Sequence, residues 1–167
     1  MSERIGIVGM GLMGQAFIKH LRNAQFMVQG FDVDPRRMDQ LAEAGGHPAE
    51  TPAAAAKDVK CVIVSVPTSD ISREIIFGPN GIAEGASEGT SLCDTTTARP
   101  EDSERTHAGL KERGIHYLDS AVSGTSTMAE AGDLVVIAGG EQADFEACRE
   151  YLAGFSRGAY YMGPAGS

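Results

Sequence analysis

The sequence has little positive charge and few aromatic residues. It contains 14 Lys and Arg against 23 Asp and Glu, which gives a formal net charge of −9 at pH 7. Because nucleic acids and anionic membranes select basic surfaces, we expect neither as a partner. No stretch approaches the roughly twenty apolar residues that cross a membrane. Tryptophan is absent and aromatic residues make up 6%, but the 42% hydrophobic content is ordinary for a folded α/β protein.

Cysteine is also scarce. Cys61, Cys93 and Cys148 are dispersed along the chain, and no pair has the spacing of metal ligands. Two of them lie in apolar, strand-like stretches. We therefore expect buried thiols in a reducing compartment, and no metal site. The first four residues lead directly into an apolar run that the fold needs, so we expect no signal peptide and a cytoplasmic protein.

The 167 residues suit a single domain, residues 1–167, with no room for a second. Apolar strand-like runs alternate with helical stretches, as in a parallel sheet with crossover helices. We therefore predict an α/β fold, a Rossmann-like, doubly wound and mostly parallel sheet. The predicted strands are 4–8, 27–31, 47–49, 61–66 and 91–93. The predicted helices are 12–22, 35–44, a helix that begins at Pro52, 71–77 and 100–113. Thr51 is the predicted N-cap of the helix at Pro52, and Asp70 is the predicted N-cap of helix 71–77.

The pattern changes after residue 114. Strand-like runs at 117–122 and 134–138 are separated by small residues with no predicted helix between them, which indicates antiparallel pairing of the last strands. A helix at 144–152 and a short strand at 159–162 complete the prediction.

The strongest motif follows the first strand. Gly9, Gly11 and Gly14 form a Gly-x-Gly-x-x-Gly pattern between a buried strand and a helix. In a dinucleotide-binding turn the first glycine allows the tight turn, the second lets the backbone approach a pyrophosphate, and the third lets the helix pack closely on the sheet. The predicted phosphate-binding residues of this turn are Gly9, Met10, Gly11, Leu12, Met13 and Gly14.

Asp32 stands at the end of the second predicted strand, where such folds place an acid that binds the ribose. Its carboxylate can accept both ribose hydroxyls and would repel a 2′-phosphate, so we predict NAD rather than NADP as cofactor. Arg36 and Arg37 lie nearby and could soften this preference, whereas Asp34 adds a second negative charge.

A second segment, Asp119–Thr125, is rich in small residues and hydroxyls. Hydroxyl and backbone N–H groups beyond a strand can hold a carboxylate, which favours a site for a small acid. A hairpin loop that needs small residues for its turns is an equally good interpretation of the residues alone.

Four motifs in order resemble the β-hydroxyacid dehydrogenases, and together they cover essentially the whole chain. They are Gly9-x-Gly11-x-Met13-Gly14, Val66-Pro67-Thr68, Asp94-Thr95-Thr96-Thr97, and Asp119-x-x-Val122-Ser123-Gly124. The family includes 3-hydroxyisobutyrate dehydrogenase, tartronate semialdehyde reductase and the cofactor domain of 6-phosphogluconate dehydrogenase. The resemblance implies hydride transfer between a nicotinamide cofactor and a small 3-hydroxy acid.

The resemblance also implies roles for individual residues. Val66, Pro67 and Thr97 would contact the cofactor, while Ser123 and Gly124, with the adjoining Thr125, would bind the substrate carboxylate. Structural explanations exist as well: Pro67 ends a strand, and Thr97 could cap the helix near Pro100.

The family's general acid/base is a lysine on a helix after a Gly-rich turn. That lysine, and the helical domain that follows it, would lie beyond Ser167, so we expect no catalytic residue in this chain and no turnover by it alone. In the family the helical domain forms most of the dimer interface, so a homo-oligomer is expected of a full-length protein. A standalone or inactive NAD-binding module is the alternative.

This sequence departs from the family pattern at four positions. Ala121 stands where proline is usual, Thr125 where a second glycine is usual, and His20 where asparagine is common. Thr96 stands where serine is usual, a mild change. A side chain at Thr125 would narrow the substrate loop and could conflict with a positive φ. We expect His20 to affect packing only.

Overall fold

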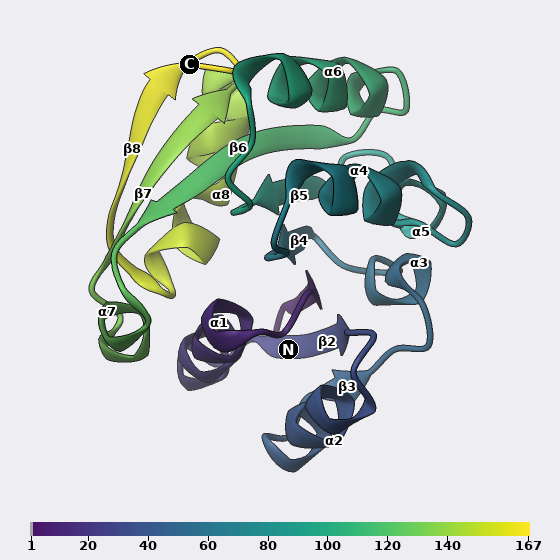
Figure 1. The fold of residues 1–167 in the computed structure, drawn as a ribbon, viewed down its shortest axis with the longest axis vertical. Coiled ribbons are helices and arrows are strands. Elements are labelled where there is room, and N and C mark those ends of the chain that lie inside the picture. The colour runs from purple at the N-terminus through teal and green to yellow at the C-terminus, as the bar shows by residue number, and fades with distance from the viewer. Residues whose placement is uncertain (1) are drawn as a thin grey trace.

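The computed structural model describes residues 2–167, and its elements alternate from the first strand onward (Figure 1). In chain order they are β1 (Arg4–Val8), α1 (Leu12–Asn23), β2 (Met27–Phe31), α2 (Pro35–Glu43), β3 (His47–Pro48), α3 (Pro52–Ala55), β4 (Cys61–Val64), α4 (Ser69–Phe77), α5 (Ile82–Gly85), β5 (Ser91–Asp94), α6 (Pro100–Lys111), β6 (His116–Ser123), α7 (Ser126–Ala131), β7 (Leu134–Gly140), α8 (Gln142–Ala153) and β8 (Ser156–Gly163).

The strands form one sheet in the order β3-β2-β1-β4-β5-β6-β7-β8. Pairing is parallel from β3 to β6, β6 and β7 are antiparallel, and β8 returns parallel to β7. The predicted Rossmann-like, mostly parallel sheet is therefore confirmed, as is the antiparallel β6–β7 pair. The strand order reverses direction between β1 and β4, which is the switch point at which such sheets bind ligands.

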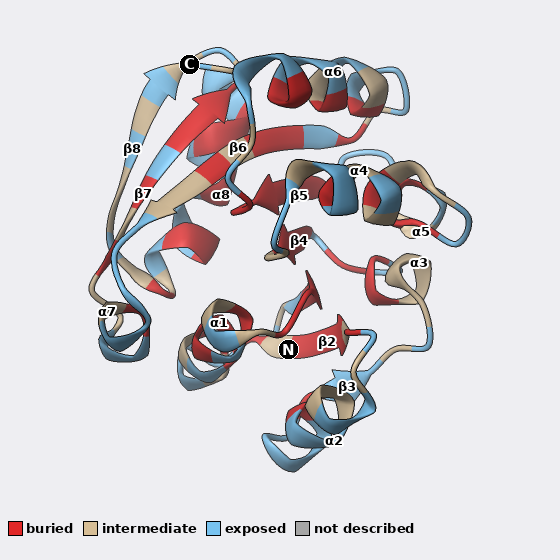
Figure 2. Ribbon diagram, viewed as in Figure 1, coloured by how far each residue is buried: buried red, intermediate tan, exposed pale blue. Residues whose placement is uncertain are grey.

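Helices cover both faces of the sheet, and the strands between them are largely buried (Figure 2). One core joins β-strand side chains such as Ile5 and Ile7 to α1 and α8. The other joins Val8, Val62 and Val64 to α3, α4, α5 and α6. Successive residues of a strand point to opposite faces, so strands covered on both sides read as continuous apolar runs, as 61–64 does.

Two predicted boundaries were wrong for local reasons. β4 ends at Val64 rather than residue 66, so Val66 and Pro67 belong to the loop that follows. Thr68, not Asp70, caps α4: its Oγ1 accepts a hydrogen bond from the amide of Ile71 at 3.3 Å. Asp70 instead lies in the first helical turn, where an acid is also favoured because of the helix dipole.

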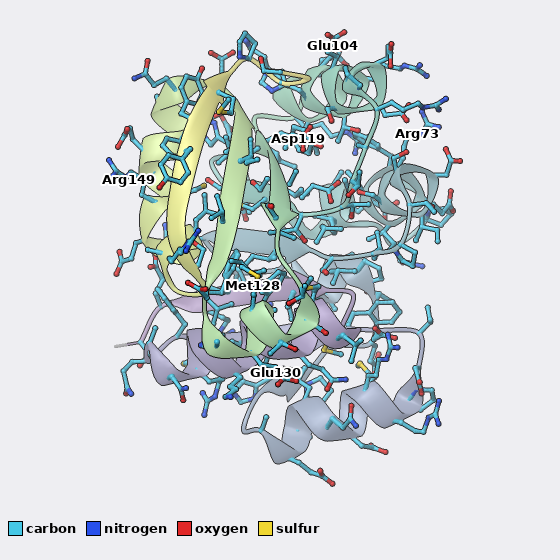
Figure 3. All side chains as sticks on the ribbon, turned by 60° about the vertical axis from the view of Figure 1, so that its left-hand side comes forward. Arg73, Glu104, Asp119, Met128, Glu130 and Arg149 are labelled. Atoms are coloured by element: carbon cyan, nitrogen blue, oxygen red, sulfur yellow. The ribbon has the colours of Figure 1, made fainter. Side chains whose placement is uncertain are left out.

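The prediction of no helix between residues 122 and 134 was also wrong, because α7 forms there. Thr125 begins the helix by accepting a hydrogen bond from the amide of Met128, and Gly132 ends it with φ 71°. Figure 3 shows α7 at the tip of the β6–β7 hairpin, with Met128 and Glu130 on it. The last strand is longer than the predicted 159–162, and its pairing with β7 is parallel.

Among residues 2–167, no helix combines the length and apolar character that a membrane crossing requires.

Candidate functional site

Two glycines of the first motif are required by close packing. Gly9 has φ 91°, and a Cβ there would run into the carbonyl of Ser65 at the end of β4. A Cβ at Gly14 would run into the carbonyl of Gly9. These glycines therefore let α1 begin immediately beside β1, in agreement with the roles predicted for them.

Gly11 differs from both because no backbone atom would block a side chain there. Its φ is −66°, which any residue can adopt, and a Cβ built there would meet only the guanidinium tip of Arg37 at 3.5 Å. Gly11 is the N-cap of α1, and no side chain caps this helix. The first amides of α1 therefore have no capping side chain, which is the arrangement that binds phosphate groups.

A cleft of about 490 Å³ opens at this point, over the β1/β4 switch point. Its walls come from the Gly9–Met13 turn, the end of β2 and the loop after β4. The lining residues are Val8, Gly9, Gly11, Leu12, Met13, Phe31, Asp32, Val33, Arg37, Ser65, Val66, Pro67, Ile71 and Ile75. Most of the predicted cofactor-binding residues are thus brought together.

Asp32 is held firmly at the wall of this cleft. Its carboxylate accepts hydrogen bonds from the amides of Met10 at 2.7 Å and Asp34 at 2.9 Å. The Arg37 guanidinium also contacts it, with Nη1 3.3 Å from Oδ2. Arg37 thus lies in the cleft beside the acid, whereas Arg36 pairs with Asp34 outside it.

Three predicted cofactor residues do not line the cleft. Met10 is fully buried, although its amide holds Asp32, and Gly14 is buried in the α1 packing. Thr97 is exposed in the turn after β5. The alternative interpretation of Thr97 as a helix cap is wrong, because Arg99 is the N-cap residue of α6 and makes no side-chain cap bond.

Asp94 is a buried carboxylate that we did not predict as a site residue, and its hydrogen bonds stabilise one wall of the cleft. Asp94, at the end of β5, accepts hydrogen bonds from the Ser72 hydroxyl and from the amide of Thr96. The Thr96 hydroxyl in turn accepts from the amide of Val66 at 3.4 Å. Asp94 therefore positions one wall of the cleft. The motif Asp94-Thr95-Thr96-Thr97 was visible in the sequence, but its contacts with α4 and with the loop after β4 were not.

The charge state of Asp94 predicts a pH effect on stability. Burial raises the pKa of Asp94, and the hydrogen bonds from Ser72 and Thr96 only partly oppose the shift. In the unfolded chain this carboxyl loses its proton near the ordinary aspartate pKa of about 3.8, and in the folded chain it does so at a higher pH. The contribution of Asp94 to the free energy of unfolding therefore falls as the pH rises from about 3.8 through the raised pKa. We expect the stability of Asp94→Asn relative to the wild type to increase across that interval. Urea unfolding of both proteins from pH 3.5 upward measures it, and a pH-independent difference would contradict it.

The predicted substrate loop follows β6 at the same edge of the sheet, because β6 runs parallel to β5. Ser123, Gly124 and Thr125 are all exposed there. Gly124 has φ 142°, but Thr125 has φ −96° and uses its hydroxyl to cap α7. The expected conflict between Thr125 and a positive φ was therefore wrong: the left-handed position is Gly124.

His20 connects this loop to the cofactor helix. Its Nε2 lies 2.9 Å from the carbonyl of Ala129 and 3.0 Å from that of Glu130, at the end of α7. Since both partners are acceptors, Nε2 carries the proton and donates to them. His20 thus does more than pack: it joins α1 to α7 by a polar contact.

We expect His20→Ala to loosen α7 selectively. Losing this hydrogen bond costs about 1 kcal/mol, so the amides of α7 should exchange with solvent roughly fivefold faster. Hydrogen exchange measures this, with Lys19→Ala as the control, because Lys19 is an exposed neighbour on the same helix. Equal exchange in the two variants would show that His20 does not hold α7.

Comparison with protein families identifies a relation over nearly the whole chain. Residues 4–163 match the family described as the NAD binding domain of 6-phosphogluconate dehydrogenase. Among curated proteins, an uncharacterized oxidoreductase of Bacillus subtilis is 32% identical over 167 residues, which cover 100% of this chain and 58% of that protein. The 3-sulfolactaldehyde reductase of Escherichia coli is 33% identical over 136 residues, which cover 81% of this chain and 46% of that protein.

A solved structure agrees with these relatives. The 3-hydroxyisobutyrate dehydrogenase of Mycobacterium tuberculosis, with L-serine, superimposes with a TM-score of 0.94 at 26% identity, covering 99% of this chain and 56% of that one. The chain spans about half the length of the relatives it matches. These named relatives are oxidoreductases, which supports the dehydrogenase interpretation over the standalone module.

Proposed function

The chain belongs to the family of NAD-binding domains of 6-phosphogluconate dehydrogenase, and from this we propose that it is the cofactor-binding half of a dehydrogenase acting on a small 3-hydroxy acid. One observation carries the proposal. The cleft at the β1/β4 switch point combines the uncapped N-terminus of α1, the lack of a side chain on Gly11 and the carboxylate of Asp32. This is the set of groups that a dinucleotide requires.

We assign the parts of the cofactor as follows. The α1 amides beyond Gly11 bind the pyrophosphate, and Asp32 accepts the hydroxyls of the adenosine ribose. Val66 and Pro67, whose loop is held by Asp94 through Thr96, form the opposite wall. When bound, the nicotinamide ring supplies a carbon that accepts or donates hydride.

NAD is the proposed cofactor, because an acid at the ribose position repels a 2′-phosphate. Arg37 weakens this discrimination, since its guanidinium contacts the same carboxylate and reaches the cleft. NADP is therefore expected to bind more weakly rather than not at all.

The substrate is proposed to be a small hydroxy acid held in part by the Ser123–Thr125 loop. This loop lies at the same sheet edge as the cofactor cleft and exposes hydroxyl and backbone groups. Two of the relatives have names that include their substrates, 3-sulfolactaldehyde reductase and 3-hydroxyisobutyrate dehydrogenase. Both substrates are small and carry an acidic group, which is consistent with this loop binding a compact anion.

We propose that proton transfer is not performed by these 167 residues. The four lysines, Lys19, Lys57, Lys60 and Lys111, are all exposed, and none lines the cleft. The family resemblance instead implies a lysine after the Gly-rich segment that ends at Ser167.

Calorimetric titration of the 167-residue chain with NAD and NADP, beside an assay of 3-hydroxyisobutyrate oxidation, tests the proposal. We expect binding of NAD, weaker binding of NADP and no turnover. Turnover would show that the chain contains its own acid/base group. Failure to bind either nucleotide, in a chain shown by circular dichroism to be folded, would overturn the cofactor assignment.

A further inference from the structure

The fold brings the three dispersed cysteines together. Cys61 on β4, Cys93 on β5 and Cys148 on α8 have their sulfur atoms within 4.8 Å of one another, and the Cys61 and Cys93 sulfurs are 3.8 Å apart. All three side chains are fully buried. The sequence could not show this, because neighbouring strands and a helix from different parts of the chain supply one thiol each.

Strand register explains why the sulfurs converge. Cys61 lies opposite Ser91, and Ile63 lies opposite Cys93, so the two cysteines occupy the same face of adjacent parallel strands. That face is covered by α8, and all three cysteines belong to the same core. The cluster is thus fixed by the sheet and by one packed helix.

We propose that Cys61, Cys93 and Cys148 form a binding site for a single soft, monovalent, thiophilic cation, for which Cu(I) is the probe. Three sulfurs each ~2.3 Å from a central ion in a plane lie ~4 Å from one another. The Cys61 and Cys93 sulfurs, 3.8 Å apart, already have this spacing, and the Cys148 sulfur lies within 4.8 Å of both. Soft thiolate ligands select Cu(I) over harder ions.

The ligand count favours Cu(I) over Zn²⁺. A structural zinc site takes four protein ligands, and within residues 2–167 no fourth Cys, His or carboxylate joins this group. Three sulfur atoms alone match the soft ligand set that Cu(I) prefers. As the metal–sulfur bonds form, the thiols lose protons to the solvent.

This site is separate from the cofactor cleft. Cys61 is the first residue of β4, whereas Val66 and Pro67 follow the opposite end of that strand. None of the three cysteines lines the cleft. The proposal therefore stands apart from the proposed function, and circular dichroism provides a check, independent of any ligand, that each variant is folded.

Anaerobic titration of the 167-residue chain with Cu(I), buffered by the competing chelator bicinchoninate, tests the site. We expect one equivalent to be withdrawn from the chelator. The X-ray absorption spectrum of the complex should fit three sulfur neighbours at about 2.3 Å. This measurement uses the unmodified protein, so it does not depend on any variant folding.

Cys93→Ala and Cys148→Ala should each weaken Cu(I) binding by on the order of 100-fold, because each removes one of three metal–sulfur bonds. The matched control is Val62→Ala, which removes buried volume from β4 on the opposite face and should leave the affinity unchanged. If the wild type competes no better than Cys93→Ala, or the spectrum shows fewer than three sulfurs, the cysteines are core residues and the proposal is wrong.

Discussion

Gly11→Asp is expected to weaken NAD binding by more than about 100-fold while leaving the free energy of unfolding unchanged or slightly increased. Gly11 is the N-cap of α1 with extended backbone dihedral angles, and Asp is a better N-cap than Gly. The new carboxylate would bind the α1 amides that the pyrophosphate needs, and would add a negative charge beside it. A loss of 100-fold corresponds to about 2.7 kcal/mol.

The neighbouring glycine of the motif provides the contrast. Gly14→Ala places a methyl group against the Gly9 carbonyl, inside the protein, where Gly11 has only the Arg37 side chain nearby. We expect this variant to lose about 1–3 kcal/mol of stability through overpacking. Calorimetric titration and urea unfolding of both variants separate the two roles. NAD binding by Gly11→Asp at wild-type affinity would show that the pyrophosphate does not lie at the α1 N-terminus.

Much of the fold could be predicted because its signals are local. The buried run before Gly9, the spacing of three glycines and the acid at Asp32 all lie within one β–α–β unit, and each reflects a backbone or packing requirement that the sequence expresses directly. The parallel sheet follows from repeated alternation of strand and helix, as the strand order confirms.

The errors arose where two local signals competed. Thr68 and Asp70 are both good N-cap residues, and only the backbone geometry decides that Thr68 bonds to the Ile71 amide. In the segment after Ser123, small residues indicate a loop as readily as a short helix. The decision for a helix comes from the Thr125 cap and from the contacts of α7 with α1, which involve residues distant in sequence.

The details of the candidate site that the sequence could not supply are all tertiary. The sequence placed both Arg36 and Arg37 near Asp32, but only the structure shows that Arg37 lines the cleft and lies 3.3 Å from the Asp32 carboxylate. Asp94 supports Val66 through Thr96 across two strands. No periodicity or spacing encodes such contacts, because they depend on which strands the sheet places side by side.

Asp32→Asn is expected to lower the ratio of NAD to NADP affinity by on the order of 100-fold. Hydrogen bonds to a charged group contribute about 1.5–3 kcal/mol, so losing the carboxylate should weaken NAD binding by roughly tenfold or more. The same change removes the repulsion between the carboxylate and a 2′-phosphate. It also releases the Arg37 guanidinium, which lies 3.3 Å from Asp32 in the wild type, to bind that phosphate. Asn keeps one oxygen, which can accept from the Met10 amide, but the Asp34 amide then loses its acceptor. Urea unfolding of the variant therefore accompanies the titration, to show that it is folded.

The contribution of Arg37 can be separated from that of Asp32 by a double-mutant cycle. In Asp32→Asn/Arg37→Ala the gain in NADP affinity should disappear, whereas the loss of NAD affinity should remain, because only the 2′-phosphate needs the guanidinium. Asp39→Asn is the matched control: it removes an exposed carboxylate on α2 that does not line the cleft, and should change the ratio little. Calorimetric titration of the wild type, Asp32→Asn, Arg37→Ala, the double variant and the control with both nucleotides measures every term. An unchanged ratio in Asp32→Asn would remove Asp32 from the ribose site and require that another group select the cofactor.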